Sequence, residues 1–256
     1  MPYDDENITE YHDIINWEII HKSTQLKGIA SDKYLSCKYV KMKLGKDLCP
    51  HRIAVYDSVE EIDLKKIIKM GNVVLKISNG NDDNIFISNN SKQDIEEIRN
   101  SLIFHFNRDY VLRIPSLNHL FSKKRIIVEK MFSPLSDLYE FKCMLFNRDI
   151  KMIMLDFYIN NSRIEAYYDA NFNCLKKAEN YYVDLSKFNI TILNELKSYA
   201  YKLSEDFPNF VRVDLYIFHD DIYLSEITFD SHAGLPRFRD IKHFVNGIKT
   251  FKRVEY

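Results

Sequence analysis

The chain has 256 residues, of which 46% are hydrophobic and 29% are charged, as in an ordinary soluble globular protein. Its formal net charge of −1 argues against a general electrostatic grip on nucleic acid, which requires a basic face. No apolar run approaches the roughly 20 residues that cross a bilayer, and the acidic start Met1–Glu6 lacks the apolar segment of a signal peptide. We therefore expect a cytoplasmic protein with no membrane span and no nucleic-acid partner.

Cysteine and glycine usage narrows the chemistry further. The cysteines are scattered without Cys-x-x-Cys spacing, so we expect small buried side chains rather than a zinc site or disulfides; they are Cys37, Cys49, Cys143 and Cys174. No two of the 6 glycines lie close enough for a Walker A loop or a dinucleotide-binding G-x-G-x-x-G. The sequence also lacks Asp-x-Asp, a metal-binding feature of one large class of nucleotide-sugar glycosyltransferases. Any nucleotide must be held by another route.

Apolar periodicity and turn signals predict strand pairs mixed with single helices. In chain order, the expected strands are Arg52–Tyr56, Asn72–Ser78, Ile85–Ile87, Arg125–Lys130, Phe141–Phe146, Ile150–Tyr158, Val211–Tyr216 and Ile222–Thr228. The expected helices are one within residues 1 to about 30, one from Ser31-Asp32 to Gly45, one after a capping box of Ser58 and Glu61, one capped by Ser91 and Asp94, and one over residues 191–206. This order favours an α+β fold over alternating βαβ units.

The last strand pair carries the most specific pattern. With a three-residue loop at His219–Asp221, Asp214 lies opposite Glu226, and Arg212 lies opposite Thr228. Two carboxylates directly across a ladder repel each other, which favours a cation between them. Magnesium fits, because it prefers one or two carboxylates together with substrate oxygens. Arg212, on the same face, can hold a phosphate as a planar bidentate donor.

Two alternatives stay open for this hairpin. Its carboxylates can simply face water on a surface strand pair, since exposed acidic residues are ordinary. A two-residue loop at Asp220-Asp221 would instead place Asp214 opposite Ile227 and weaken the case for a metal site.

Polar residues embedded in strands follow one another in a specific order along the chain. They are Asp32-Lys33, Lys76, Glu129-Lys130-Met131, Glu140-Phe141-Lys142, Arg212-x-Asp214 and Glu226-x-Thr228. In this succession the chain resembles the ATP-grasp superfamily, and in particular it is similar to the TupA-like ATP-grasp proteins of teichuronopeptide and surface-polysaccharide biosynthesis. The segments that carry the resemblance are Ser31–Tyr34, Ala54–Ser58 and Asp206–Tyr216, and it runs from about residue 31 to about residue 240.

The resemblance implies a nucleotide held between two α+β lobes. On that basis we expect an N-terminal helical segment (residues 1–50), a small lobe with a hinge (51–132) and a C-terminal lobe with the metal site (133–256). ATP and magnesium are the expected cofactors. Small-molecule or glycan carboxylates and amines are the expected partners.

Residue roles are carried over from the same resemblance. Lys33, Lys76 and Lys142 are expected to reach the ATP phosphates, and the hinge Glu129-Lys130-Met131 to meet the adenine edge and the ribose. The implied metal ligands are Asp214, Glu226 and Thr228, the implied catalytic residues are Arg212 and Lys142, and the implied substrate-binding residues are Arg237 and Arg239. Several of these residues can also be solvated surface residues without a role in binding. Lys76 can occupy an exposed strand position, Lys33 can be a solvated residue in the first turn of a helix, and the arginines at 237 and 239 can be solvated.

The implied activity is an ATP-dependent carboxylate–amine ligase that works through an acyl phosphate. Its expected product joins an amino acid or amine to a uronic acid of a bacterial surface polysaccharide or a precursor of one. Two departures from the pattern are an acidic pair in the loop Asn79–Asp83, which would repel phosphates, and Arg163 as a loose substitute for a basic residue expected after the strand near Asp156. These departures keep two alternatives open, a degenerate ATP-grasp module that binds a nucleotide or a partner, and a glycosyltransferase of the same pathway.

Overall fold

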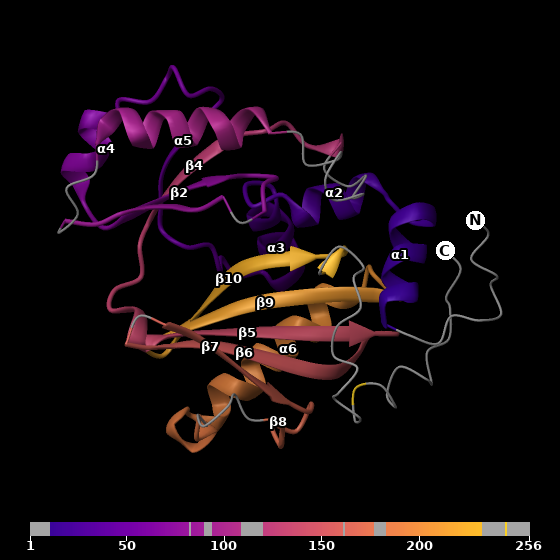
Figure 1. The fold of residues 1–256 in the computed structure, drawn as a ribbon. Coiled ribbons are helices and arrows are strands. Elements are labelled where there is room, and N and C mark those ends of the chain that lie inside the picture. The colour runs from indigo at the N-terminus through magenta and orange to yellow at the C-terminus, as the bar shows by residue number, and fades with distance from the viewer. Residues whose placement is uncertain are drawn as a thin grey trace.

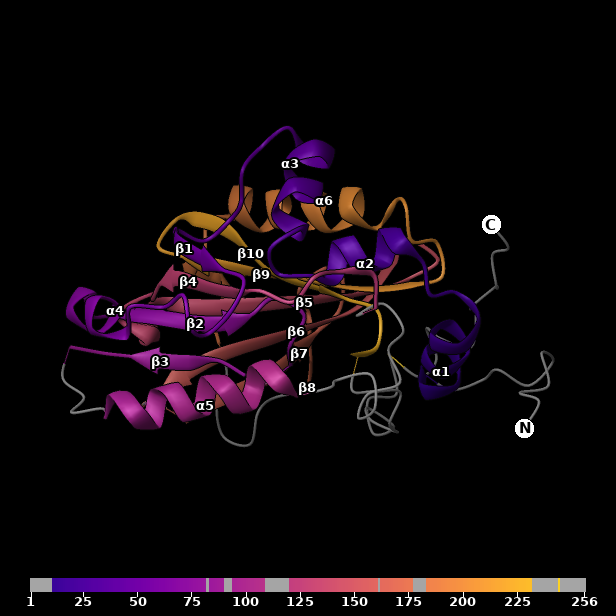
Figure 2. The ribbon, with the colours of Figure 1, turned by 90° about the horizontal axis from the view of Figure 1, so that it is seen from above.

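Two antiparallel sheets lie one above the other in the computed structural model, which describes residues 11–81, 83–89, 94–108, 120–160, 162–176, 183–231 and 244 (Figure 1). The smaller sheet has the order β1-β4-β2-β3 and the larger sheet the order β10-β9-β5-β6-β7-β8. Helices α4 and α5 accompany the smaller sheet, whereas α2, α3 and α6 lie with the larger sheet and α1 lies at its end (Figures 1 and 2). The arrangement confirms the expected α+β class.

The smaller sheet and its helices are built from the first half of the chain. The strands are β1 (Arg52–Tyr56), β2 (Val73–Ile77), β3 (Ile85–Ile87) and β4 (Ile126–Lys130), and the helices are α4 (Leu64–Met70) and α5 (Ile95–Asn107). Their apolar side chains form one core, in which Leu75, Ile77, Val128, Ile67 and Leu102 are buried. The predicted capping box is wrong: Asp63, not Ser58, caps α4 by accepting from Lys66 N, because its carboxylate reaches the free N–H groups of the first turn.

The larger sheet comes from the second half of the chain. Its strands are β5 (Leu138–Phe146), β6 (Asp149–Ile159), β7 (Ser162–Tyr168), β8 (Cys174–Lys176), β9 (Phe210–Phe218) and β10 (Asp221–Thr228). The helices that pack with it are α1 (Tyr11–His21), α2 (Gln25–Ser31), α3 (Ser36–Leu44) and α6 (Ile190–Ser204), and two short 3-10 turns are η2 (Leu135–Asp137) and η3 (Leu185–Lys187). Strands β7 and β8 are additions to the predicted set. The predicted helix at Ser31-Asp32 begins later, at Ser36, after a turn in which Asp32 Oδ1 accepts from Tyr34 N and Leu35 N.

Strand alternation gives the larger sheet two different faces. On β5, Phe141, Cys143 and Leu145 are buried in the core that includes α6. The other face of the same strand carries Glu140 and Lys142 and continues with Met144 and Phe146, which pack in the core that includes α1. One face of the sheet therefore carries a polar region next to the apolar surface on which α1 packs.

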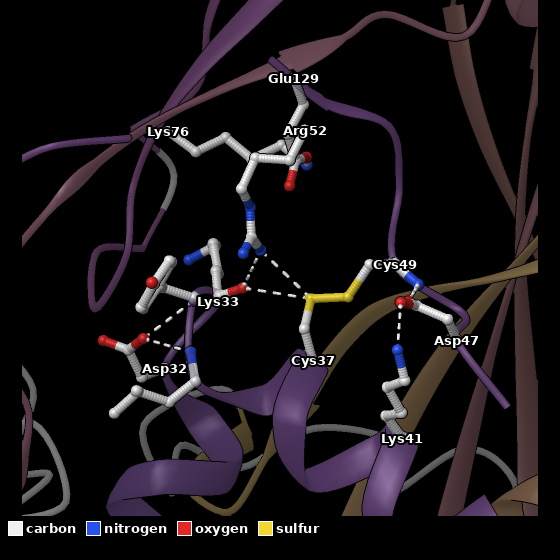
Figure 3. Close-up of a disulfide and its surroundings, with 11 residues drawn as sticks. Asp32, Lys33, Cys37, Lys41, Asp47, Cys49, Arg52, Lys76 and Glu129 are labelled. Carbon is white, nitrogen blue, oxygen red and sulfur yellow. Dashed lines mark hydrogen bonds and ion pairs between the residues drawn. A yellow bond between two sulfur atoms is a disulfide. The ribbon is translucent and has the colours of Figure 1, made fainter. Parts of the chain in front are cut away.

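The cysteine prediction is wrong at one pair. Cys37 of α3 and Cys49, just before β1, form a disulfide with a Cα–Cα distance of 5.7 Å (Figure 3). Cys143 is buried as expected, whereas Cys174 is exposed. The spacing of the cysteines did not indicate this pair, because the pair depends on the turn at Gly45. The φ of 66° at Gly45 brings the segment that contains Cys49 back toward α3.

A buried ion pair fixes the N-terminal helices to the sheet. The Lys27 ammonium of α2 donates to Glu18 Oε2 of α1, and both side chains are 2% exposed. Asn209 Nδ2 donates to Glu18 Oε1 at 2.7 Å, which ties both helices to the start of β9. Within the described ranges, no helix has the length and apolar character needed to cross a membrane.

We predict that Lys27→Ala lowers the free energy of unfolding by about 3–5 kcal/mol, because it leaves the Glu18 carboxylate buried without a cation. Urea denaturation measures this change, with exposed Lys65→Ala of α4 as the matched control. The double variant Glu18→Gln, Lys27→Met is expected to recover part of the loss, since neither charge is then buried. Equal stability of Lys27→Ala and Lys65→Ala would contradict the prediction.

Candidate functional site

A cleft between the two sheets collects most of the predicted site residues. Near the connection from β4 to β5 its lining is mainly apolar, with Val74, Phe86, Phe132, Leu135 and Leu138. Further along the strands its lining is charged, with Lys33, Lys76, Lys142 and Glu226. The cleft thus changes from apolar to charged along its length, and lysines alternate there with glutamates.

One row of paired residues crosses the charged part of the cleft. Lys142 of β5 lies opposite Asp214 of β9, and Asp214 lies opposite Glu226 of β10. Arg212 lies opposite Thr228, as expected from the sequence. The three strands therefore bring a lysine, two carboxylates, an arginine and a hydroxyl to one place on the sheet.

The predicted three-residue loop is wrong, although the carboxylates face each other as expected. The turn contains only His219 and Asp220, and Asp221 pairs with Phe218. The register then shifts by one residue between Leu224 and Glu226, so Ser225 forms a β-bulge. The bulge restores the pairing of Asp214 with Glu226 that the shorter turn would otherwise have displaced.

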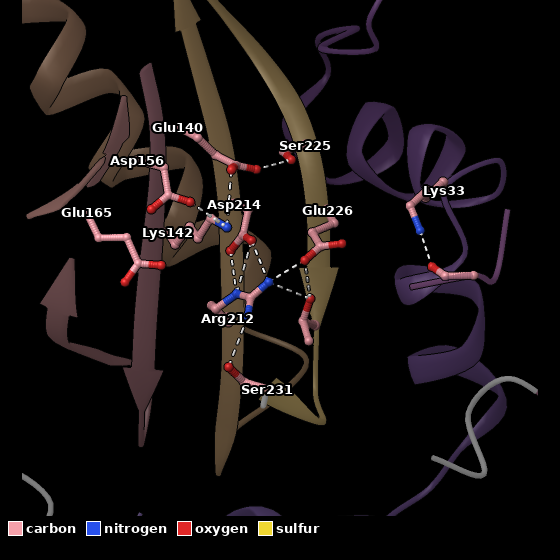
Figure 4. A network of polar contacts seen from close by, with 12 residues as sticks. Lys33, Glu140, Lys142, Asp156, Glu165, Arg212, Asp214, Ser225, Glu226 and Ser231 are labelled. Atoms are coloured by element: carbon pink, nitrogen blue, oxygen red, sulfur yellow. Dashed lines mark hydrogen bonds and ion pairs between the residues drawn. The ribbon is translucent and has the colours of Figure 1, made fainter. Parts of the chain in front are cut away.

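The cation between these two carboxylates is Arg212 itself (Figure 4). Its Nε donates to both Asp214 oxygens, at 2.8 and 3.0 Å, and its Nη2 donates to Asp214 Oδ2 at 2.7 Å and to Glu226 Oε1. Arg212 Nη2 also lies 3.3 Å from Thr228 Oγ1. Because Arg212 is 7% exposed and Asp214 is fully buried, this charge cluster lies beneath the cleft rather than on the surface.

Burial and charge divide the two carboxylates. Burial raises the pKa of Asp214 to about 7, even though Arg212 and Lys142 oppose the shift. Burial acts in the same direction on Glu226, but Arg212, Lys33 and Lys142 outweigh it and lower the pKa of Glu226 to about 2. At neutral pH, Glu226 is therefore the firmly ionised member of the pair, and 30% of its side chain is exposed toward the cleft.

A second charged network extends the site across β5, β6 and β7. Lys142 Nζ lies 3.2 Å from Glu140 Oε2 and 2.9 Å from Asp156 Oδ2, and Arg163 Nη2 lies 2.5 Å from the same Asp156 oxygen. Burial raises the pKa of Asp156, which is 2% exposed. The pKa of Lys142 is raised despite burial, because Glu140, Asp214 and Asp156 surround it. Arg163 thus lines the cleft beside Lys142 and is linked to it through one carboxylate.

The smaller sheet contributes Lys76, whose Nζ pairs with Glu129 Oε2 at 2.8 Å inside the cleft. Lys33 connects the helices to this sheet: its N–H donates to Ser78 O at 2.7 Å, and its ammonium donates to Gly80 O. In Figure 3, the Arg52 side chain lies between the disulfide and the Lys76–Glu129 pair, and its guanidinium donates to Lys33 O. Lys33 is therefore not fully solvated, because its ammonium and its N–H both donate to backbone carbonyls.

The connection after β4 is held by the backbone. Lys130 N donates to His51 O at 2.9 Å, and Met131 N donates to Asn72 O at 2.8 Å. These two N–H groups are therefore already bonded within the protein. The side chains of Lys130, Met131 and Phe132 line the cleft.

The acidic loop does not present both carboxylates to the cleft. Asp83 is 4% exposed and turns toward α5, where His105 Nδ1 lies 3.0 Å from its Oδ1. Asn81 and Asn84 line the cleft instead. Asp82, Arg237 and Arg239 lie outside the described residues.

The polar residues that line the cleft but were not predicted as site residues include Glu140, Ser225, Tyr158 and Tyr216. The signal for Glu140 was present, because it precedes Lys142 by two residues and so shares its face of the strand. Ser225 gave no signal, since its position depends on the bulge. Its hydroxyl donates to Glu140 Oε1.

The chain belongs to the TupA-like ATP-grasp family, whose model matches residues 13–243. The two-sheet α+β architecture described above is accordingly an ATP-grasp fold. A search among curated proteins finds no match.

Similar solved structures have low sequence identity to this chain. The D-alanine–D-alanine ligase of Bacillus anthracis complexed with ATP is 17% identical, with 81% of this chain and 57% of that chain covered and a TM-score of 0.47. The D-alanine–D-alanine ligase of Helicobacter pylori is 15% identical, with 88% of this chain and 62% of that chain covered and a TM-score of 0.45. An L-amino acid ligase of Bacillus licheniformis is 11% identical, with 80% of this chain and 43% of that chain covered and a TM-score of 0.48. The chain thus spans less than two thirds of the length of each of these structures.

We predict that Glu226→Gln lowers the free energy of unfolding at neutral pH, because it removes the ionised partner of Arg212. A folded-state pKa of about 2 lies below the ordinary value of 4.5, so the charged form contributes stability above about pH 4.5 that is lost as the pH falls toward 2. Urea unfolding should show a difference from the unaltered protein that is largest near neutral pH and shrinks in acid. Glu165→Gln, on β7, is the control, and a pH-independent difference for Glu226→Gln would contradict the prediction.

Proposed function

We propose that this protein is an ATP- and magnesium-dependent ligase that joins a carboxylate to an amine through an acyl phosphate. The observation that carries the proposal is the polarity of the cleft, which is apolar near the connection from β4 to β5 and charged beside Glu226, where Lys33, Lys76 and Lys142 line it. A flat base followed by a chain of phosphates has the same polarity. Membership of the ATP-grasp family supports the same assignment.

Each part of the nucleotide has residues suited to it. Val74, Phe86 and Leu138 would cover the base, whereas Lys33, Lys76 and Lys142 would face the phosphates. Glu140 lies between these regions, because Leu138, Glu140 and Lys142 follow each other at every second position of β5, about 7 Å apart. We assign the ribose hydroxyls to Glu140, because its side chain is 17% exposed whereas that of Glu129 is 4% exposed.

The donor set beside the cleft fits magnesium that arrives with a nucleotide. Asp214 and Glu226 would hold it, with Thr228 beside them, since magnesium takes one or two carboxylates and completes its shell with phosphate oxygens and water. No group of three or more His, Cys, Asp or Glu side chains within the described ranges forms a separate metal cage. When bound, magnesium would supply positive charge to the phosphate oxygens.

The protein's own groups would align the reactants and offset charge. The substrate carboxylate oxygen attacks the γ-phosphorus of ATP, the bond to the β-phosphate oxygen breaks, and ADP leaves. The amine nitrogen then attacks the acyl carbon, inorganic phosphate leaves, and the amine proton passes to solvent or phosphate. Arg212 and Lys142 would stabilise the developing negative charge on the transferred phosphoryl group.

For the substrates, we propose an amino acid or amine and a uronic acid of a bacterial surface polysaccharide or its precursor. The family supports this choice through its place in surface-polysaccharide biosynthesis. Arg237 and Arg239 stay our candidates for the anchors of the acceptor or its carboxylate, and a cytoplasmic location would place the protein beside ATP.

A second candidate is a nucleotide-binding module without turnover. One observation favours it: both oxygens of Asp214 already accept from Arg212, so one carboxylate of the proposed metal pair is engaged within the protein. Such a module would bind ATP but would not release ADP with any acid.

The decisive experiment supplies ATP, magnesium, glucuronic acid and hydroxylamine, which traps an acyl phosphate as a hydroxamate. We predict ADP release that depends on the acid, together with hydroxamate formation, and loss of both in Asp214→Asn. ATP binding without ADP release, for glucuronic acid and for a panel of other acids, would favour the binding module. Preference for a nucleotide sugar over ATP would instead support a glycosyltransferase.

We further predict that Glu140→Gln reduces the preference for ATP over 2′-deoxyATP. A charged hydrogen bond contributes about 1.5–3 kcal/mol, so the unaltered protein should prefer ATP by about tenfold or more in binding. Glutamine at 140 would keep an acceptor for Ser225 while weakening the contact with the ribose. Glu165→Gln is the matched control because Glu165 lies on the same sheet but does not line the cleft, and an unchanged preference in Glu140→Gln would remove the ribose assignment.

A further inference from the structure

Arg212 is held from its far side by a residue that belongs to none of the predicted motifs. Its Nη1 donates to Ser231 Oγ at 3.0 Å, on the side of the guanidinium away from Glu226 (Figure 4). Ser231 is 1% exposed and follows the end of β10 by three residues. Water therefore cannot readily replace its hydroxyl as the acceptor.

Ser231 is in turn tied to the N-terminal helix. The Tyr11 hydroxyl of α1 donates to Ser231 O at 3.1 Å across 220 positions of sequence. The Tyr11 ring is 4% exposed and packs against Phe146, Phe210 and Phe244, with ring centroids 6.2, 6.0 and 5.7 Å away. This aromatic packing leaves the hydroxyl little freedom.

The chemistry of the guanidinium explains why a neutral acceptor suits this place. Arginine has five N–H donors in a fixed plane. Nε and Nη2 serve Asp214, Glu226 and Thr228, and one N–H of Nη1 serves Ser231, so a second Nη1 N–H has no acceptor among the described residues. A third carboxylate at position 231 would add negative charge beside a group that is to meet a phosphate, whereas a hydroxyl accepts from Nη1 without adding charge.

We propose that Ser231 is a positioning residue for Arg212, and that α1 keeps Ser231 in place through Tyr11. Together with the contacts of Nε and Nη2 to Asp214, the hydrogen bond to Ser231 restricts rotation of the guanidinium about its Nε–Cζ bond and so sets the direction of the remaining Nη1 N–H. The effect of this role on turnover rests on the ligase function proposed above. The effect on the orientation of the guanidinium is independent of that function.

The orientation is tested without any substrate. ¹⁵N NMR of the arginine side chains, with the Arg212 signals assigned by Arg212→Lys, measures rotation about Nε–Cζ in the full chain. We expect slow rotation in the unaltered protein, rotation about tenfold faster or more in Ser231→Ala, and slow rotation in Ser231→Thr, which keeps the hydroxyl. Unchanged rotation in Ser231→Ala would overturn the proposal, whatever the enzyme does.

The catalytic consequence is tested with ATP, magnesium, glucuronic acid and hydroxylamine. Ser231→Ala should lose about tenfold in kcat with the KM for ATP within about twofold, and Ser231→Thr should recover most of the loss. Tyr11→Phe should lower kcat in the same way, whereas Tyr39→Phe should not, although Tyr39 is another buried tyrosine that donates to a backbone carbonyl, that of Leu203.

Equal losses of kcat in Ser231→Ala and Ser231→Thr would overturn the role of the hydroxyl in turnover. Absence of turnover in the unaltered protein would instead count against the ligase function, and the rotation measurement would then decide the positioning role alone.

Discussion

The charged core of the large sheet depends on one guanidinium between two acids. Without Arg212, Asp214 and Glu226 would face each other across adjacent strands with no cation between them, and such a pair is destabilising. Asp214 is fully buried, so the cost of its charge would be large. The position of Arg212, two residues before Asp214 on the same strand face, makes the compensation local.

The same interaction frames the chemistry of the proposed ligase. A phosphate that enters the cleft would compete with Asp214 and Glu226 for the guanidinium, while magnesium would compete with the guanidinium for the carboxylates. A bound phosphate would therefore offset the charge of the guanidinium released from its carboxylates, and bound magnesium would offset the charge of the carboxylates released from the guanidinium. This coupling gives a physical reason for nucleotide and metal to bind together rather than one at a time.

The strands of the cleft were predictable because their signal is local. Alternating apolar residues defined β1, β2, β4, β5, β6, β9 and β10 to within a few positions, and the order of polar residues in them indicated the family. The pairing of Asp214 with Glu226 was also expected, although through a longer turn and without the bulge. The roles of these residues in binding ATP and magnesium stay predictions.

What the sequence did not reveal depends on contacts between distant segments. The Cys37–Cys49 disulfide requires the turn at Gly45, and the contact from Tyr11 to Ser231 joins residues 220 positions apart in the sequence. The internal use of Arg212 was missed because a motif specifies which residues meet but not which partner each one prefers. Strands β7 and β8 are short or mixed in polarity, so their alternation was weak.

The bulge at Ser225 has a consequence for how this hairpin tolerates changes in length. Asp214 faces Glu226 in the observed hairpin, which has a two-residue turn and a bulge at Ser225. Asp214 would also face Glu226 in a hairpin whose turn is one residue longer and whose ladder has no bulge. Homologous hairpins can therefore gain a residue at the tip and lose the irregularity, or the reverse, while the acids keep their partners. Because both forms have the same number of residues between Asp214 and Glu226, a sequence alignment without gaps matches the two acids correctly but shifts the strand partners of residues 221–224 by one position.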